Sequence, residues 1–442
     1  MSTIETKYNK YIFIILGAAL VFKLIFAFAV TMELRSDSME YDTLAKNMIN
    51  LGEYAFDGKP TARLSCGYPL FIYIVYSIFG SEQLMVKIIQ SFLEIFTGLL
   101  FYFVCRFYFN PKYSVFGLLI FTFLPANLLY SQTVLTESLF GLFSMFLFYY
   151  CLKEKIDWKI IFVGIIWGYS ILIRTSFVLS VFLIPVFFII YRKKIFTGYS
   201  HTRIKKIILY SLLFFAGVLL CLSPWLIRNK NVVGSYTLAT QGGYTFWSGS
   251  NPEATGTWYH NIEESNPLFK NTDEVARDRE FYKLGFDYAI HNPHKFFITG
   301  IKKIGYLFSS ERLILLYFKT QQEGNKTSTE VYKSINPFFI ALVNIPYFII
   351  LLLGLWGIFM LKEKTFFIYG FIASWIITFF LYVALSRYHY VLIPFFVIGT
   401  VKFLKDYKFE LKKLSKLKII SASAFNLFLL VVWFIEFYLL YK

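Results

Sequence analysis

The feature that most constrains this chain is its repetition of long apolar runs, which are separated by short charged loops. A run of about 20 apolar residues is long enough to cross the hydrocarbon core of a bilayer as one α-helix. Of the 442 residues, 57% are hydrophobic, which exceeds the roughly 45–50% of soluble domains. We therefore predict an all-α polytopic membrane protein with about eleven transmembrane helices.

The apolar runs divide the chain into three parts. We predict an N-terminal transmembrane module over residues 1–226, an extracytoplasmic loop region over 227–336 and C-terminal transmembrane helices over 337–442. A first outer loop, about residues 31–83, interrupts the N-terminal module. The predicted spans cover residues 11–30, 84–107, 113–130, 137–151, 158–173, 177–191, 207–226, 337–361, 365–385, 390–404 and 419–440.

Two outer segments carry amphipathic helical patterns. In the first outer loop, apolar residues recur at i, i+3, i+4, i+7 and i+8 between residues 41 and 49, which is one face of a helix. We expect a short helix on the membrane surface there. A similar pattern over residues 297–308 predicts a second amphipathic helix, which we expect at the membrane interface or against the spans.

The basic residues gather in short loops at 153–155, 192–206 and 402–418. Alternation of the spans puts these loops on one side, and the positive-inside rule identifies that side as the cytoplasm. The net charge of +17 therefore follows from membrane topology and does not indicate nucleic-acid binding. We predict a multi-pass protein of the cytoplasmic (inner) membrane, with an active site on the extracytoplasmic face.

The same alternation gathers a different set of charged residues on the outer side. Asp37 follows the first span and Glu137 begins the fourth, while Arg174, Arg228 and Arg387 lie at the outer ends of later spans. Carboxylates at a membrane boundary are costly without a role. The arginine fork matches phosphate oxygens, and a carboxylate beside it can act as a general base. The set suits a lipid phosphate and a hydroxyl group that is to be deprotonated.

Short motifs occur in a fixed order between Asp37 and Pro394. They are Asp37-Ser38-x-x-Tyr41, Gly67-Tyr68-Pro69-Leu70-Phe71, Phe79-Gly80, Leu124-Pro125 with Tyr130-Ser131, Thr136-Glu137, Ser223 to Asn229, the glycine-rich Gly242 to Gly256, and Arg387-Tyr388 up to Pro394. In this order they resemble the membrane glycosyltransferases of the GT-C fold. The closest branch is the protein O-mannosyltransferase and aminoarabinose-transferase superfamily, which is glycosyltransferase family 39-like.

The resemblance implies a GT-C-like helical bundle that transfers a hexose or pentose from a polyprenyl-phosphate donor to a cell-envelope glycan or lipid, with inversion at the anomeric carbon. It implies that Asp37 deprotonates the acceptor hydroxyl and that Glu137 holds the acceptor or a metal. It also implies that Arg387, with Arg228 and Arg174 as further candidates, holds the donor phosphate. One position departs from the family: Asp37 is followed by Ser38, where protein O-mannosyltransferases carry Glu. This difference argues against a protein acceptor.

Aromatic residues and one histidine near these motifs are candidates for contacting the substrate. They are Tyr41, Tyr68, Tyr244, Trp247, Tyr388 and His389. Tyr244 and Trp247 could equally belong to an interfacial aromatic belt. His389 could be a structural residue, since no second histidine is spaced with it as in a metal site.

The charged candidates also have interpretations that need no catalysis. Asp37 could cap the surface helix, with Glu40 completing a capping box. Glu137 could be a helix-start carboxylate that the helix dipole favours. Arg174 and Arg387 could extend to lipid headgroups.

Asp37 and Glu137 could together hold a divalent cation such as Mg²⁺ or Mn²⁺, although no cluster of ligands demands one. Two other functions would use the same residues. A transporter or flippase for a lipid-linked sugar needs polar residues that continue through the spans, and spans two to six contain few charges. A glycan polymerase or ligase with a pyrophosphate-linked oligosaccharide donor predicts a wider outer loop with more arginines.

Overall fold

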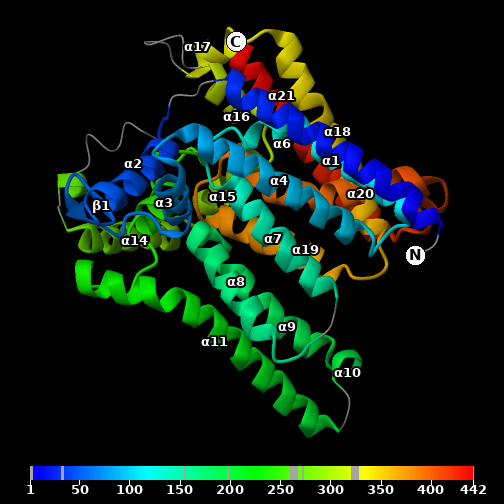
Figure 1. Ribbon diagram of the computed structural model, residues 1–442, viewed down its shortest axis with the longest axis horizontal. Helices are drawn as coiled ribbons and strands as arrows, with labels where there is room; N and C mark the ends of the chain where they lie inside the picture. Colours follow the sequence, from blue (N-terminus) through cyan, green and yellow to red (C-terminus); the bar gives the residue numbers. More distant parts are fainter. Residues whose placement is uncertain are drawn as a thin grey trace.

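Figure 1 shows the computed structural model of the chain, which describes residues 3–30, 34–153, 156–196, 199–258, 267–270, 273–319 and 328–441. Residues 31–33 of the predicted outer loop, and residues 259–266, 271–272 and 320–327 of the predicted region 227–336, lie outside the described residues. Over the described ranges the fold is helical, and its one sheet is a hairpin of two strands, β1 (Ala55–Phe56) and β2 (Lys59–Pro60). The prediction of an all-α fold is confirmed.

The bundle consists of apolar helices that follow the predicted spans in order. Five of those described are long and apolar enough to cross a membrane: α1 (Thr3–Ala29), α4 (Gln83–Cys105), α11 (Ser200–Val233), α18 (Pro337–Met360) and α21 (Lys416–Tyr441). Shorter helices complete the set: α5 (Pro111–Phe123), α7 (Glu137–Leu152), α8 (Ile160–Ile173), α9 (Leu183–Ile190), α19 (Phe366–Leu381) and α20 (Ile393–Glu410). Large apolar side chains are exposed on the long helices, such as Phe13 on α1 and Phe434 on α21, as contact with lipid requires. The polytopic helical bundle is confirmed.

Three predicted spans are interrupted by irregular segments. The third divides into α5 and α6 (Pro125–Tyr130), because the residue before a proline disfavours the helical region and Leu124 is extended. The sixth begins with the 3-10 helix η1 (Thr175–Phe182), directly after Arg174. The tenth begins with the 3-10 helix η4 (Ser386–Leu392), which contains Arg387. The irregular segments at η1 and η4 place the two arginines at helix ends instead of within continuous helices.

Residues 67–79, which we predicted as part of a loop, form the helix α3 (Gly67–Phe79). A Cβ atom on Gly67 would lie 2.4 Å from the backbone nitrogen of Ile173, so only glycine lets α3 begin against the end of α8. The Tyr169 hydroxyl donates a hydrogen bond to the carbonyl of Gly67 at 3.0 Å. This contact fixes the first outer loop beside Arg174.

The helices α18 and α20 pack backbone against backbone. A Cβ atom on Gly357 would lie 1.7 Å from the carbonyl oxygen of Gly399, so the crossing requires glycine. Small residues at such crossings let membrane helices approach closely. Because α20 continues directly from η4, the close packing also fixes the position of Arg387.

The remaining helices are short. They are α2 (Asp37–Asn50), α10 (Arg192–Ile195), α12 (Gly242–Ser248), η2 (Pro267–Lys270), α14 (Glu274–His291), α15 (Pro293–Leu307), α16 (Arg312–Lys319), α17 (Ser328–Lys333) and η5 (Leu411–Lys413). The helices α2 and α15 confirm the two predicted amphipathic helices. In Figure 1, α2, β1, α3 and α14 gather at one end of the molecule, and the N-terminus and α10 lie at the other. The division of the chain near residues 226 and 336 stays a prediction.

Candidate active site

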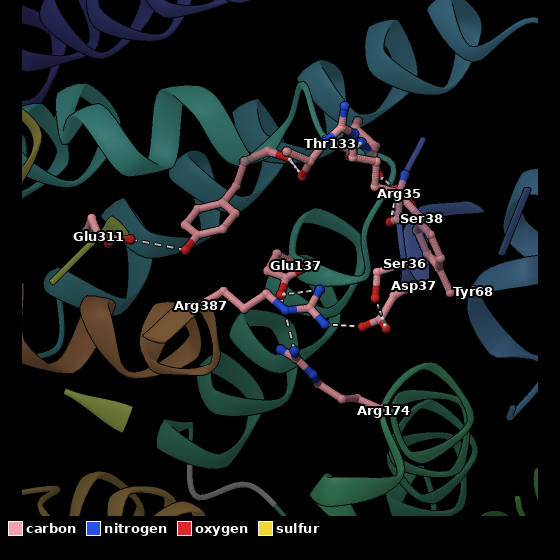
Figure 2. A network of polar contacts seen from close by, with 12 residues as sticks. Arg35, Ser36, Asp37, Ser38, Tyr68, Thr133, Glu137, Arg174, Glu311 and Arg387 are labelled. Carbon is pink, nitrogen blue, oxygen red and sulfur yellow. Dashed lines mark hydrogen bonds and ion pairs between the residues drawn. The ribbon is translucent and has the colours of Figure 1, made fainter. Parts of the chain in front are cut away.

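Asp37 is the first residue of α2 and its carboxylate points toward the bundle (Figure 2). Oδ2 accepts an ion-paired hydrogen bond from Nη2 of Arg387, which lies 350 residues further along the chain. Oδ1 accepts from the hydroxyl of Ser36 at 3.3 Å. The residue before the helix is Ser36, and it makes no side-chain capping bond. Asp37 therefore lies inside the first turn of α2, and its strongest partner is an arginine from η4.

Glu137 is the first residue of α7, and its side chain is fully buried. Oε1 accepts a hydrogen bond from Nη2 of Arg174 at 3.1 Å and lies 3.7 Å from Nη1 of Arg387. Within the described residues, Oε2 has no hydrogen-bond partner. A buried carboxylate is costly unless it is paired, and here two guanidinium groups supply the pairing.

Arg174 and Arg387 lie side by side around Glu137 (Figure 2). Both guanidinium groups also lie over the ring of Tyr388, at 4.7 Å for Arg174 and 5.2 Å for Arg387. Nη1 of Arg174 is buried and has no hydrogen-bond partner in the described part of the chain. Two carboxylates and two guanidinium groups thus form one cluster with no net charge, in which one buried oxygen and one buried nitrogen have no hydrogen-bond partner among the described residues.

The charges of the cluster control the protonation of Asp37. Burial raises the pKa of the Asp37 carboxyl, but the charge of Arg387 and the hydrogen bonds from Arg387 and Ser36 outweigh burial and hold that pKa below its usual value. The side chain of Asp37 is 37% exposed, whereas that of Arg387 is 6% exposed. The Asp37 carboxylate is therefore ionised and accessible from the solvent, and it is ion-paired with Arg387.

A cavity of about 1310 Å³ opens at the cluster and includes Asp37 and Arg387 in its lining. Near them it is polar, with Glu40 and Arg63, which form an ion pair at 2.9 Å. Its other walls come from α15, α16 and α21, where apolar residues predominate and Lys302, Arg312 and Glu436 lie among them. These walls contain Ile301, Leu313, Leu316, Phe428, Val431, Val432, Ile435, Leu439 and Leu440.

Tyr317 on α16 is a residue of the cavity that the sequence did not indicate. Its phenol lies close enough to the cluster for the charges to act on it. Burial, Asp37 and Glu137 raise the pKa of the Tyr317 hydroxyl and Arg387 lowers it, and together they bring that pKa to about 12. Trp258, after the glycine-rich stretch, also lines the cavity. The only available signal for Tyr317 was the short apolar pattern of residues 312–319, which carries no motif.

Arg228 does not lie in the cluster. Its guanidinium donates to the carbonyl of Tyr54 at 2.8 Å and to the carbonyl of Thr61, and it lies over the ring of Trp225 at 5.1 Å. Arg228 therefore ties the first outer loop to α11. The expectation that it shares a phosphate site with Arg387 is corrected by this placement.

His389 also lies apart from the cavity. It is fully buried, its Nε2 is 2.9 Å from Oε1 of Glu311, and its Nδ1 is 2.9 Å from the carbonyl oxygen of Leu307. Its ring stacks on Tyr347 with centroids 4.4 Å apart. These contacts occupy both ring nitrogens. The structure therefore favours a structural role for His389 over contact with the substrate.

The aromatic candidates divide in a similar way. Tyr68 is fully buried and donates to Oε1 of Gln90 at 2.7 Å, so its hydroxyl faces the bundle interior. Tyr41 packs edge-on against Tyr68 with centroids 5.0 Å apart, one turn after Asp37. Tyr388 supports the two arginines.

Tyr244 and Trp247 form an aromatic layer behind the cavity wall. Both rings pack against Phe281, at 5.3 and 5.0 Å, and Tyr244 lies 5.4 Å from the ring of Trp258. Because Trp258 lines the cavity and the other two do not, the structure places Trp258 closest to a ligand.

The arrangement does not fit a divalent cation between Asp37 and Glu137. The guanidinium of Arg387 contacts both carboxylates and occupies the space between them. Over the ranges that the structure describes, no group of three or more His, Cys, Asp and Glu side chains is arranged to hold a metal ion.

Residues 65–227 match the family profile described as dolichyl-phosphate-mannose-protein mannosyltransferase. The matched stretch includes Glu137 and Arg174, and it is less than half of the chain. No curated protein matches the chain.

The solved structures that share similarity with the fold include three from two organisms. The apo oligosaccharyltransferase of Archaeoglobus fulgidus is 12% identical with a TM-score of 0.48, and the alignment covers 94% of this chain and 54% of that one. The oligosaccharyltransferase AglB of the same organism, in complex with an inhibitory peptide and a dolichol-phosphate, is 13% identical with a TM-score of 0.46. That alignment covers 98% of this chain and 55% of AglB. ArnT from Cupriavidus metallidurans, bound to undecaprenyl phosphate, is 10% identical with a TM-score of 0.46. That alignment covers 90% of this chain and 79% of ArnT.

This chain thus spans about half the length of the two archaeal proteins. The resemblance expected from the motifs is confirmed by the profile: over residues 65–227 the chain is similar to the dolichyl-phosphate-mannose-protein mannosyltransferases, a family of GT-C membrane glycosyltransferases.

Proposed function

We propose that the protein transfers a monosaccharide from a polyprenyl-phosphate donor to a cell-envelope glycan or lipid at the extracytoplasmic face of the cytoplasmic membrane. The observation that carries the proposal is the contact between Asp37 and Arg387 at the mouth of the large cavity. A carboxylate beside a buried guanidinium supplies a base and a phosphate-binding group at one point.

The cavity supports a donor that has both a charged and an apolar part. Its charged end contains Arg387, and its apolar walls come from α15, α16 and α21. A polyprenyl phosphate combines one phosphate with a long hydrocarbon chain, so the two parts of the donor correspond to the two parts of the cavity. Burial of the chain would contribute roughly 25 cal/mol per Å² of apolar surface removed from water.

Arg387 has to exchange partners when the donor binds. Nη2 of Arg387 holds Asp37 in the structure, and a phosphate oxygen would compete for the same Nη2 group. Glu137 lies 3.7 Å from Nη1 and would keep the guanidinium in place during the exchange. Asp37 would then lose its cationic partner and gain a negative neighbour, and both changes raise the pKa of a carboxyl group. Donor binding would thus convert Asp37 from a paired carboxylate into a stronger base.

The sugar is transferred in one displacement at the anomeric carbon. The acceptor hydroxyl oxygen forms a bond to the anomeric carbon while the Asp37 carboxylate takes its proton. The bond from the anomeric carbon to the phosphate oxygen breaks, and the polyprenyl phosphate leaves with the electron pair. Arg387, which lines the cavity, stabilises the charge that develops on the leaving phosphate, and Arg174 holds Glu137 beside it. Attack opposite the leaving group inverts the anomeric centre.

Glu137 acts as a positioning residue in this scheme, because it touches the two arginines and does not line the cavity. Tyr317 and Trp258 line the cavity beside the charged end and would contact the sugar or phosphate through a hydroxyl group and an aromatic ring. Tyr41 and Tyr388 support this end from behind.

The proposal is tested by Asp37→Asn in cells that depend on this chain, with mass spectrometry of the envelope glycans and lipids. We expect transfer to fall by about 10²–10⁴-fold, the usual contribution of a general base. Asp57→Asn is the matched control, because Asp57 is an exposed carboxylate of the same loop with φ of 48°, a conformation that Asn tolerates. A folded Asp37→Asn protein that still yields the wild-type glycans would reject Asp37 as the base. If the lipid-linked sugar instead accumulates on the cytoplasmic side of the membrane when the chain is absent, the transporter alternative is favoured.

A further inference from the structure

A second hollow lies at the end of the bundle opposite the active-site cavity. It has a volume of about 570 Å³ and is enclosed by the end of α18, the start of α19, the end of α20 with η5, and the start of α21. Its lining includes Lys362, Lys413, Lys418 and Glu410. None of these residues belongs to the site described above.

The hollow carries a surplus of positive charge. Lys362 and Lys413 share Glu410, with Nζ to carboxylate distances of 3.2 and 3.4 Å. Lys418 donates to the carbonyl oxygen of Phe359 at 3.0 Å, close to the end of α18. Three lysines against one glutamate leave two positive charges. The side chains of Lys362 and Lys413 are 68% and 64% exposed, so they can turn to a new anionic partner without disrupting the core.

Apolar surface borders this charge. Leu361 and Leu414 line the hollow itself. On the adjoining helices Phe409, Leu417 and Ile420 are exposed. A free anion would need the lysines alone, whereas a ligand with a charged head and hydrocarbon tails would use both surfaces. The combination therefore favours a lipid over a soluble anion.

The depth of the hollow agrees with a membrane surface. The residues of α21 that line the active-site cavity run from Phe428 to Leu440, so they lie 10 to 22 residues beyond Lys418 in the hollow, which is about 15–33 Å at 1.5 Å per residue. The hydrocarbon core of a bilayer is about 30 Å thick. The hollow thus lies near one surface of the bilayer, on the side where the basic loops gather, and the active-site cavity extends from the middle of α21 to the opposite surface.

We propose that this hollow binds the phosphate headgroup of an anionic glycerophospholipid, with the acyl chains against the exposed apolar residues of α20 and α21. Basic pockets between transmembrane helices on the cytoplasmic side recognise such headgroups. The phosphate takes the place of Glu410 as the partner of Lys362 and Lys413, and Lys418 closes the site. The bound lipid holds the first turn of α21, whose other end forms a wall of the active-site cavity.

The test uses the full-length protein in neutral detergent, with bound lipid measured by native mass spectrometry. Phosphatidylglycerol is the probe, phosphatidylcholine with the same acyl chains is the neutral lipid, and sodium phosphate is the soluble anion. We expect phosphatidylglycerol to bind in preference to phosphatidylcholine, and sodium phosphate at equal concentration to leave it bound. Displacement by sodium phosphate, or equal binding of the two lipids, would overturn the proposal.

Two sets of variants locate the site. Each lysine removed near an anionic headgroup should weaken binding by roughly fivefold, so Lys362→Gln, Lys413→Gln and Lys418→Gln together should reduce it on the order of a hundredfold. The control removes three lysines elsewhere on the same predicted side, Lys193→Gln, Lys205→Gln and Lys206→Gln. Equal losses in both triple variants would show that surface charge alone retains the lipid, and would overturn the site.

Glu410→Gln provides a test that does not depend on the folding of the triple variant. Its carboxylate competes with the headgroup for Lys362 and Lys413. Removing that charge should strengthen phosphatidylglycerol binding by roughly fivefold. Unchanged or weaker binding would contradict the proposed exchange of partners. Because none of these measurements uses sugar transfer, failure here leaves the proposed enzymatic function unaffected.

Discussion

Two buried ionic groups lie two residues apart on η4 and differ in what they leave open. Around His389, Nε2 meets Oε1 of Glu311, and Oε2 of Glu311 accepts from the Tyr130 hydroxyl at 3.1 Å. Around Arg387, the structure leaves Oε2 of Glu137 and Nη1 of Arg174 without a hydrogen-bond partner among the described residues. Arg387 also lines the cavity, whereas His389 does not. Access to the cavity, which Arg387 has and His389 lacks, therefore separates the candidate site from the structural network more than burial or charge does.

The largest effect that sharpens this comparison is expected from Arg387→Ala. The change removes the group that holds Asp37 and, in the proposed mechanism, the donor phosphate. Loss of one such electrostatic stabiliser costs about 10²–10³-fold in rate. Sugar transfer should be measured at several donor concentrations, with Arg192→Ala as control, because Arg192 is an exposed arginine of α10. Equal activity of the two variants would remove Arg387 from the site.

A smaller and more selective effect is expected from the matched pair Glu137→Gln and Glu311→Gln. Both glutamates are buried. Glu137→Gln weakens the hold on Arg387 and Arg174, and misplacement of catalytic groups costs up to about 100-fold in rate. Glu311→Gln disturbs a closed network and should lower the free energy of unfolding by about 1–3 kcal/mol, while the folded fraction keeps its activity. Transfer rates and unfolding curves for both proteins check this contrast, which is lost if the two variants behave alike.

The pH dependence of stability provides a weaker signal. The pKa of Asp37 is lowered in the folded protein. Its ion pair therefore stabilises the fold fully when the pH is above the pKa of Asp in the unfolded chain, about 3.9. This contribution is lost as the pH falls through the lower pKa of Asp37 in the folded protein. Wild type should therefore lose more stability than Asp37→Asn on going from pH 6 to pH 3. Thermal unfolding of both proteins over this range measures the difference, and parallel curves would contradict the assigned ion pair.

The smallest effect is expected from removal of divalent cations. Because Arg387 lies between Asp37 and Glu137, a chelator should leave the transfer rate unchanged. The measurement compares transfer before and after treatment with a chelator, with added Mg²⁺ or Mn²⁺ as the control. A rate that falls and is restored by one of these ions would place a cation at the site after all, and would require Arg387 to move away from one carboxylate.

Local patterns in the sequence determined the spans, the amphipathic helices α2 and α15, and the set of charges from which the site is made. Span length and hydrophobic periodicity depend on neighbouring residues, and lipid imposes the same requirement on every span. Asp37, Glu137, Arg174 and Arg387 could be selected together because each breaks an otherwise apolar boundary. The motif resemblance then assigned roles to them.

Other features were decided only by the tertiary structure. The sequence did not separate Arg228 and His389 from the arginines of the cluster, since all of them occur beside helix ends with similar motifs. It also did not indicate α3, whose start depends on the space that Gly67 leaves against α8, or Tyr317, which reaches the cluster from α16. The physical reason is that packing between distant segments decides which charged groups form pairs. Asp37 and Arg387 are 350 residues apart in the chain, and no local sequence pattern predicts which arginine will contact Asp37.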